Sequence, residues 1–555
     1  MNTNNIGIQQ LERLVHNQDA EKSYQAIIQI LISAEMKGDF QLSCNENNRE
    51  NRLTHNYTRL ASAMTAFFAN PNLKLSAAGY HALNIYKKHI LHVFELSGFG
   101  GTDHLLTLAG EVVGNNYSQT SIRNEQQLMK FLLLYSLSSE IELDFEKLLK
   151  QAPEMVLPIY ITLLAEGGVL SKSYSIRKEK YLRLGKMIEG IKIDQKLLGR
   201  ISSLWMNCSY ESFAEKHDIK ENLNVLLRTF MNEKGVKIAP LPSKRIIKER
   251  PTLVIPMERF SSIHAMFRCY APSIDQLRDK YNLICLVEER NIDDEAKKLF
   301  DKVVLIDPTV APSKIIGAVL KLKPDMLYFP SLGMSDWTLL LANQRLAPIQ
   351  FMTTGHPATS KSPFIDYVLL PETLFSNDFD CFTEKVVLLD DKQFAVNMPP
   401  KMDAKILANI NVNPEIIKLA IPSKAVKLSA NFMAVCQQII DNSSREIELH
   451  FFPNEKGMNH QLISSRILEL IPSAKVYEQT NYQDYIENLN QCDIHLSPFP
   501  FGGSNSNVDS MRQGIPIIVL EGYEPHSRTD SYYIKNSNLP DDLTTFNEEA
   551  YLKAA

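Results

Sequence analysis

The 555-residue chain is too long for one hydrophobic core, and typical domain sizes predict about two to four domains. With 44% hydrophobic and 22% charged residues, its composition is that of a globular protein and leaves little room for extended disorder. The formal net charge of -5 provides no positive field that would hold a polyanion, which argues against a dedicated nucleic-acid binder.

The N-terminus, the apolar runs and the cysteine spacing indicate where the protein is located. The N-terminus, MNTNNIGIQQ, lacks the charged start and apolar core of a signal peptide, and no apolar run approaches the roughly 20 residues that span a bilayer. We therefore expect a soluble, cytoplasmic protein. The 7 cysteines are scattered singly without a C-x-x-C pair, which predicts reduced thiols and no zinc site.

The first part of the chain, residues 1–240, is predicted to be an all-α domain. Apolar residues recur there at spacings of three and four, as in EQQLMKFLLLYSLSS, and no fixed repeat period is present. The glycine-containing segment SGFGGTD has too few correctly spaced glycines for a dinucleotide fingerprint and is expected to be a loop. The basic, proline-broken stretch KGVKIAPLPSKRIIKERP then marks a connection between domains.

From residue 251 the pattern changes to short β-rich runs that alternate with helix-like stretches. Such alternation is typical of parallel sheets with helical crossovers, so we predict two Rossmann-like lobes, 251–400 and 401–555. Ligands of such sheets bind beyond the carboxyl ends of the strands. The runs are TLVIP, NLICLVE, KVVLID, MLYFP, APIQFMT and DYVLLP in the first lobe, and IIKLAIPS, EIELHFFP, KVYEQT, DIHLSPFP and PIIVLEG in the second.

The most informative strand-end loop is SPFPFGGSNSNVD, residues 497–509, which lies between the strand DIHL and a predicted helix. Gly502 and Gly503 would let the backbone approach a ligand, and free amides at the helix start can bind a diphosphate. Asp509 could accept hydrogen bonds from ribose hydroxyls, and Asn505 can both donate and accept. The competing interpretation is that Ser504 or Asn505 caps the helix and Asp509 complements its dipole.

Other strand ends of the second lobe carry further candidates. Lys427 follows KLAIPS and could neutralise phosphate charge on a leaving nucleoside diphosphate, although solvated lysines are common. Gln479 and Thr480 are candidates for nucleotide contacts. The segment LEGYEPHSRTD follows PIIVL and is expected to bring His526, with Glu524 and Asp530, near the donor, with a helix cap as the equal alternative.

In the first lobe, His264 and Arg268 are four residues apart after TLVIP, so on a helix they would share one face. Gly355 and His356 follow APIQFM and are candidates for acceptor or sugar contacts, although a lone histidine is more often structural. No H-x-x-x-H, D-x-D or acidic triplet occurs at a strand end, so we expect no metal site.

Several of these motifs together resemble one family, the soluble bacterial protein N-glycosyltransferases that glucosylate high-molecular-weight adhesins and are grouped with the O-linked N-acetylglucosamine transferases. The resemblance runs from the helical region almost to the last residue. It is carried by ASAMTAFFANPNLKLS, MNCSYESFAEKHDIK, ERFSSIHAMFR, LAPIQFMTTGHPATSKSPFIDYV, VKLSANF and SPFPFGGSNSNVD.

The resemblance implies a GT-B fold behind the all-α domain, with UDP-glucose as donor, asparagine in N-x-S/T sequons as acceptor, anomeric inversion and no metal or other cofactor. By motif, Lys427 corresponds to the diphosphate-binding lysine, Asn505 and Asp509 to the uridine diphosphate contacts, and His264 with Arg268 to the active-site pair of the first lobe. The family's C-terminal helices are expected to be missing beyond Ala555.

Three hypotheses follow. The first is transfer of glucose to asparagine. The second is transfer to serine or threonine, or use of another nucleotide sugar, because Gln479 and Thr480 replace a histidine and a serine of the family and GGSNSN replaces its usual run. The third, from a different class, is a catalytically weak adhesin-binding partner in which the helical domain acts.

Overall fold

The computed structural model describes residues 7–37, 49–109, 111–112, 120–121, 124–168, 170–236, 249–375, 381–390 and 414–555. The chain forms two compact units, which are described separately. The first comprises Met1–Leu163, Val169–Lys178 and Pro453–Gln479, and the second comprises Leu164–Gly168, Glu179–Phe452 and Thr480–Ala555.

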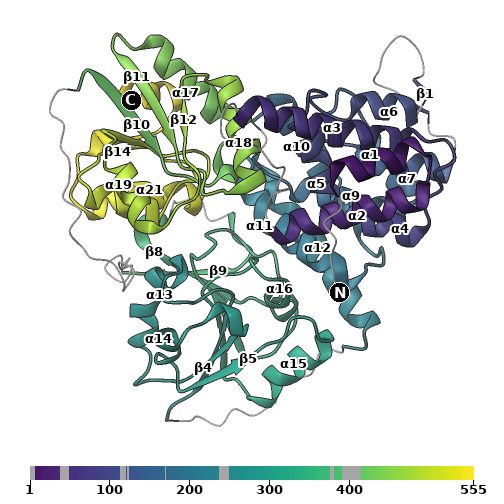
Figure 1. Ribbon diagram of the computed structural model, residues 1–555. Coiled ribbons are helices and arrows are strands. Elements are labelled where there is room, and N and C mark those ends of the chain that lie inside the picture. The colour runs from purple at the N-terminus through teal and green to yellow at the C-terminus, as the bar shows by residue number, and fades with distance from the viewer. Residues whose placement is uncertain are drawn as a thin grey trace. The chain divides into compact units, whose positions relative to one another are not determined.

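The first unit is built mainly from helices, as the apolar spacing predicted. A short antiparallel pair, β1 (Glu111–Val112) with β2 (Thr120–Ser121), departs from the all-helical prediction, because two-residue strands leave no periodic signal. The helices are α1 (Ile8–His16), α2 (Ala20–Lys37), α3 (Arg49–Ala69), α4 (Ala77–Ile85), α5 (Lys87–Glu95), α6 (Asp103–Ala109), α7 (Glu125–Leu134), α8 (Phe145–Gln151), α9 (Pro153–Ala165) and α10 (Lys172–Leu182) (Figure 1).

A distant part of the sequence completes this unit. Helix α18 (Gly457–Leu470) and the short strand β12 (Lys475–Val476) belong to it, although they come from the second β-rich half of the chain. The guanidinium of Arg466 on α18 donates to Glu95 at 2.6 Å and 2.8 Å, and the Tyr57 hydroxyl donates to Gln461 at 2.8 Å. These contacts join segments that are hundreds of residues apart in the sequence.

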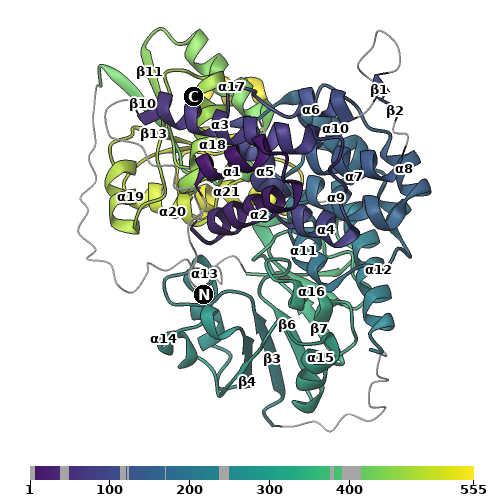
Figure 2. The same ribbon diagram turned by 45° about the vertical axis from the view of Figure 1, so that its right-hand side comes forward.

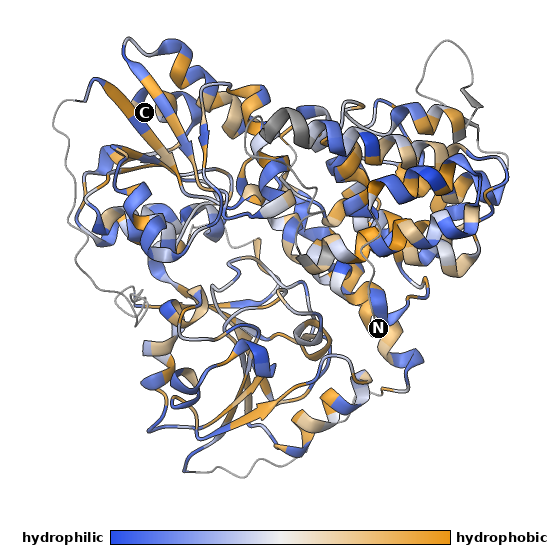
Figure 3. Ribbon diagram, viewed as in Figure 1, coloured by the Kyte–Doolittle hydropathy of each residue, from blue (hydrophilic) through white to orange (hydrophobic). Residues whose placement is uncertain are grey.

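The second unit begins with helical segments and continues into two parallel sheets. The helical segments are η1 (Gly185–Ile188), η2 (Gln195–Leu197), α11 (Leu198–Asn207), η3 (Cys208–Tyr210), η4 (Ala214–His217) and α12 (Asp218–Glu233). The sheets confirm the predicted parallel α/β architecture, and Figure 3 shows hydrophobic residues concentrated in their strands.

The first sheet has the strand order β5-β4-β3-β6-β7-β8-β9, and every pairing is parallel. Six strands match the predicted runs. The edge strand β9 was not predicted, although four of its five residues, KVVLL, are apolar. The strands and intervening helices are β3 (Thr252–Met257), α13 (Ala265–Asp275), β4 (Asn282–Val287), η5 (Glu289–Asn291), α14 (Asp294–Lys297), β5 (Lys302–Leu305), α15 (Pro312–Lys321), β6 (Met326–Phe329), α16 (Asp336–Ala342), β7 (Ile349–Met352), β8 (Tyr367–Pro371), η6 (Glu372–Leu374) and β9 (Lys385–Leu389).

The second sheet runs β11-β10-β13-β14-β15 within this unit, again with parallel pairings. The two-residue strand β15 was not predicted. The elements are β10 (Ile416–Ile421), η9 (Ala425–Lys427), α17 (Ala430–Asn442), β11 (Glu446–Phe451), α19 (Tyr482–Leu489), β13 (Ile494–Leu496), α20 (Asn505–Arg512), β14 (Ile517–Leu520), α21 (Pro525–Asn536), η10 (Asp541–Leu543), β15 (Thr544–Thr545) and α22 (Glu548–Ala554).

The strand order reverses between β3 and β6 in the first sheet and between β10 and β13 in the second. Neighbouring crossovers at such a point run to opposite faces of the sheet, which opens a crevice beyond the carboxyl ends of the two strands. The strands around the first of these points can be followed in Figure 2. The loops that follow β3, β6, β10 and β13 are therefore the positions where the fold favours a ligand.

The loop after β6 is held by a buried carboxylate at the end of β3. Glu258 accepts hydrogen bonds from the Ser331 hydroxyl at 2.7 Å, the Gly333 amide at 3.0 Å, the Ser335 amide at 2.9 Å and the Thr338 hydroxyl at 2.6 Å. Burial raises the pKa of Glu258, and these donors oppose that shift. The carboxylate thus satisfies the groups at the start of α16 and fixes the loop beside the first reversal point.

No helix in the part of the chain that the structure describes is long and apolar enough to cross a membrane.

Replacement of Glu258 by alanine is expected to lower the thermal unfolding midpoint by at least about 5 °C, because the buried Ser331 hydroxyl and Gly333 amide lose their acceptor, at a cost of about 3 kcal/mol. The matched control is Glu295→Ala, which removes an exposed ion pair with Lys298 and should cost less than about 1 kcal/mol. Circular dichroism of both variants checks this. Equal midpoints for the two variants would contradict the assigned role of Glu258.

Candidate active site

The candidate site begins at the reversal point of the second sheet. Lys427 ends η9, directly after β10, and the segment 497–504 connects β13 to α20. Both segments therefore follow the two strands between which the order reverses. Helix α21 follows the next strand, β14, and is the third element that contributes residues to the candidate site.

Lys427 is held by the loop after β13. Its ammonium donates to the Gly502 carbonyl and lies 4.8 Å from the centroid of the Phe501 ring, within the range of a cation–π contact. Burial lowers the pKa of Lys427 to about 8, opposed by the nearby Asp530 carboxylate. The site thus contains a partly desolvated cation, whose attraction for an anion is stronger than in water.

The two adjacent glycines are required by close packing. A Cβ on Gly502 would lie 2.3 Å from the Asp530 carboxylate, and one on Gly503 would lie 2.2 Å from the Asn507 side chain. Asp530 on α21 is buried, accepts a hydrogen bond from the Ser497 hydroxyl, and has its pKa raised by burial. The glycines therefore let the loop pass over Asp530.

The start of α20 carries no side-chain cap. Ser504 occupies the N-cap position without accepting a helix amide, and its hydroxyl instead lies 3.0 Å from the Tyr533 hydroxyl. The Asn505 amide lies 3.6 Å from the Cys269 sulfur, a weak polar contact. The capping interpretation of Ser504 is therefore wrong, and the helix start remains suited to an anion.

Asp509 forms a buried ion pair. The guanidinium of Arg268 on α13 donates to its two oxygens at 2.7 Å and 3.4 Å, and the Tyr482 hydroxyl donates at 2.5 Å. Arg268 also lies 5.6 Å from the Tyr482 ring centroid. Asp509, predicted to contact ribose, thus has protein partners that connect the first sheet to the second. Tyr482 was not predicted, because a tyrosine in the first turn of a helix carries no distinctive spacing.

His264 does not share a helix face with Arg268, contrary to the sequence prediction. It is the N-cap residue of α13, with extended backbone, and its Nδ1 accepts from the Met266 amide at 3.2 Å. Burial lowers its pKa to about 4, and Arg259 and Lys424 add to the shift. A neutral ring that accepts at Nδ1 carries its proton on Nε2, so His264 offers a hydrogen-bond donor.

His356 and Gly355 follow β7, and their surroundings differ. A Cβ on Gly355 would lie 2.3 Å from the Pro330 carbonyl, so this glycine is needed for packing. The buried ring of His356 is parallel to the Phe501 ring, with centroids 6.0 Å apart. His526 is stacked on Phe501 at 4.8 Å. The loop after β13 thus brings the two predicted histidines to one phenylalanine.

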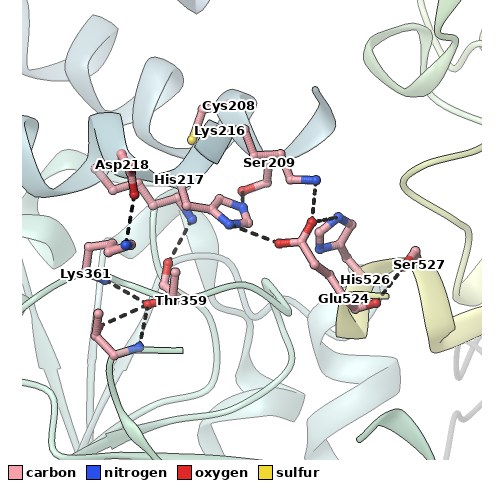
Figure 4. A network of polar contacts seen from close by, with 12 residues as sticks. Cys208, Ser209, Lys216, His217, Asp218, Thr359, Lys361, Glu524, His526 and Ser527 are labelled. Carbon is pink, nitrogen blue, oxygen red and sulfur yellow. Dashed lines mark hydrogen bonds and ion pairs between the residues drawn. The ribbon is translucent and has the colours of Figure 1, made fainter. Parts of the chain in front are cut away.

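A polar network lies behind these histidines (Figure 4). Glu524 pairs with the Lys216 ammonium, lies 3.1 Å from Nδ1 of His217 and lies 3.4 Å from Nε2 of His526. Sequence reasoning did not assign roles to Lys216, His217 or Ser209. Their segment, MNCSYESFAEKHDIK, is one of the motifs that carry the family resemblance, and this motif was the sequence feature that could have identified them.

Gln479 and Thr480, predicted to contact the nucleotide, make local contacts in the structure. Gln479 belongs to the first unit, where its backbone amide donates to the Glu455 carbonyl at 2.8 Å. Thr480 is exposed, and its hydroxyl donates to the Asn481 carbonyl at 3.2 Å. Among the described residues, no group of three or more His, Cys, Asp or Glu side chains is placed to bind a metal ion.

Comparison with known proteins supports the resemblance seen in the motifs. Residues 5–141 match the family described as HMW1C N-terminal. Two relatives named UDP-glucose:protein N-beta-glucosyltransferase, from Actinobacillus pleuropneumoniae serotype 5b (strain L20) and serotype 7 (strain AP76), are each 26% identical over 572 residues. The alignment covers 100% of this chain and 92% of each relative.

The fold is matched by a solved structure, an O-GlcNAc transferase mutant of Thermobaculum terrenum. Its TM-score is 0.57 at 14% identity, covering 100% of this chain and 90% of that chain. At this identity the match shows the fold alone, and it confirms the GT-B architecture. The similarity of this chain to the protein N-glycosyltransferases, first indicated by its motifs, is thereby confirmed along its full length.

Proposed function

We propose that this chain is an inverting glycosyltransferase that moves glucose from UDP-glucose to asparagine side chains in N-x-S/T sequons of proteins such as adhesins. The observation that carries the proposal is the partly desolvated ammonium of Lys427 at the reversal point of the second sheet, beside an uncapped helix start. The full-length similarity to UDP-glucose:protein N-beta-glucosyltransferases supports the choice of substrates.

Donor binding would use the groups of the second sheet. The ammonium of Lys427 and the amides at the start of α20 would bind the diphosphate, because both present positive charge to an anion. As the bond to glucose breaks, negative charge grows on the departing UDP, and the same groups stabilise it more strongly. We include metal independence in the proposal, since Lys427 and the helix start supply the positive charge that such a leaving group needs.

The first sheet would supply orientation. His264 is neutral near pH 7, because burial lowers its pKa to about 4, and its Nε2–H can donate to a phosphate oxygen or a sugar hydroxyl. The Arg268–Asp509 pair would set the position of α20 relative to α13. An asparagine amide is a weak nucleophile. Holding it in line with the anomeric carbon is therefore the main way in which the site would lower the reaction barrier. A cytoplasmic location, where nucleotide sugars are made, is part of the proposal.

The direct test is incubation of the purified full chain with UDP-glucose and a peptide that contains one N-x-S/T sequon. We expect a mass gain of one hexose on the asparagine, and none on a peptide in which that asparagine is glutamine. Parallel reactions with other nucleotide sugars, scored by nucleoside diphosphate release, test the donor. Hexose on serine or threonine would instead favour O-linked transfer, and peptide binding without turnover would favour a binding partner.

Lys427→Met is expected to weaken UDP binding by at least about tenfold, because the diphosphate loses a charge-assisted contact. Isothermal titration measures this dissociation constant. The matched control is Lys553→Met, at an exposed position on α22 of the same unit, which should leave UDP affinity unchanged. Unchanged affinity in the Lys427 variant would remove this residue from the donor site.

The affinity for UDP should also depend on pH. The free protein's Lys427 has its pKa lowered to about 8, and a bound diphosphate favours the charged ammonium. Affinity should therefore be constant from pH 7 to the pKa and then fall, by up to about tenfold per pH unit, as the ammonium loses its proton. The Lys427→Met variant should show a flat profile over the same range. An equal fall in both proteins would assign the pH dependence to another group.

A further inference from the structure

Four side chains form a continuous hydrogen-bonded chain behind the candidate site. Glu524 Oε1 lies 3.1 Å from Nδ1 of His217, whose Nε2 lies 3.1 Å from the Ser209 hydroxyl, and that hydroxyl lies 2.8 Å from Nε2 of His356. Figure 4 shows the part from Glu524 to Ser209. Ser209 is fully buried, so it is not placed to act as a nucleophile toward a substrate.

The chemistry of these four groups decides which of them donates and which accepts each hydrogen bond. Glu524 forms an ion pair with the buried Lys216 ammonium, and the carboxylate of such a pair only accepts hydrogen bonds. Nδ1 of His217 therefore carries a proton. Burial lowers the pKa of His217 well below its usual value, with Lys216, Lys220 and Lys361 adding to the shift, so the ring is neutral and its Nε2 has no proton.

The Ser209 hydroxyl continues the same donor-to-acceptor order. Because Nε2 of His217 can only accept, the Ser209 hydroxyl donates to it and must accept from Nε2 of His356. Burial also lowers the pKa of His356 well below its usual value, with contributions from Lys220, His217 and Lys427. A neutral His356 with its proton on Nε2 has a bare Nδ1. Within the described residues, no hydrogen bond to this Nδ1 is present.

We propose that Glu524, His217 and Ser209 are positioning residues that hold His356 in its Nε2–H tautomer, so that its bare Nδ1 accepts a hydrogen bond from a hydroxyl of the transferred hexose. The tautomer follows from the hydrogen-bond geometry together with the neutral state of the two rings, whereas the hexose contact rests on the proposed function. His356 stacks on Phe501, and the same phenylalanine contacts the Lys427 ammonium. If that ammonium binds the diphosphate, the sugar bonded to the diphosphate lies nearby.

The tautomer can be read directly from the ring nitrogens. Full-length protein labelled with ¹⁵N-histidine is compared by NMR with His356→Gln, which identifies the His356 signals. We expect a pyridine-like shift for Nδ1 and a pyrrole-like shift for Nε2, and the opposite assignment would overturn the proposal. In Glu524→Gln the amide group can donate to His217, which would reverse the donor and acceptor roles from His217 to His356. The ¹⁵N shifts of Nδ1 and Nε2 of His356 should then exchange.

The hexose contact is tested by titrating UDP and UDP-glucose separately. In Ser209→Ala we expect affinity for UDP-glucose to fall by about five- to tenfold, with affinity for UDP unchanged. The matched control is Ser203→Ala on α11, whose hydroxyl donates to the Gly199 carbonyl and contacts no member of the chain. Equal losses for both ligands in Ser209→Ala would indicate a structural role only and overturn the contact.

The two measurements separate failure of this inference from failure of the proposed function. If the wild-type chain bound neither UDP nor UDP-glucose, the proposed function would be contradicted, and the hexose contact with it. The NMR measurement needs no ligand and would still decide the tautomer. If the wild-type chain bound UDP-glucose while Ser209→Ala bound it equally well, the hexose contact would be rejected and the donor assignment kept.

Discussion

The candidate site depends on one interaction, the holding of a single ammonium group at the end of β10 by the loop after β13. Lys427 keeps its charge in a partly desolvated position because Gly502 accepts from it, Phe501 presents its ring to it, and Asp530 lies close by. Removal of any of these groups would favour the neutral amine. The two glycines and the buried carboxylate are therefore parts of one arrangement, which presents a cation where parallel sheets bind anionic ligands.

A second constraint joins the two sheets of the same unit. The Arg268–Asp509 pair is almost fully buried, and such pairs seldom add net stability, because both ions lose their hydration. Loss of one partner would leave an uncompensated charge, so the pair is better understood as a device for alignment. It fixes α20, whose start borders the lysine site, against α13, whose N-cap residue is His264. The ion pair thus orients the two helices together with the weaker contact between Asn505 and Cys269.

Burial shifts the pKa of three histidine rings in the candidate site. His264, His356 and His526 each have a lowered pKa, mainly from desolvation. A neutral imidazole has one donor and one acceptor, so its neighbours decide what it offers to a ligand. The Met266 amide makes His264 a donor, and the chain through Ser209 makes His356 an acceptor. Backbone and hydroxyl partners therefore assign complementary roles to chemically identical side chains.

The sequence by itself determined the types and order of the elements, except for the strands β1, β2, β9 and β15. Short apolar runs with turn residues at their ends locate the strands, and the glycine pair and Lys427 could be placed at strand ends without a structure. The pairing of Arg268 with Asp509, the N-cap position of His264 and the contacts of Asp530 were decided only by the tertiary structure. Arg268 and Asp509 are 241 positions apart in the sequence, and local periodicity carries no information about which strand-end loops meet. The same physical reason explains why Ser209 and His217, ordinary residues of a helical segment, became evident only when the chain was folded.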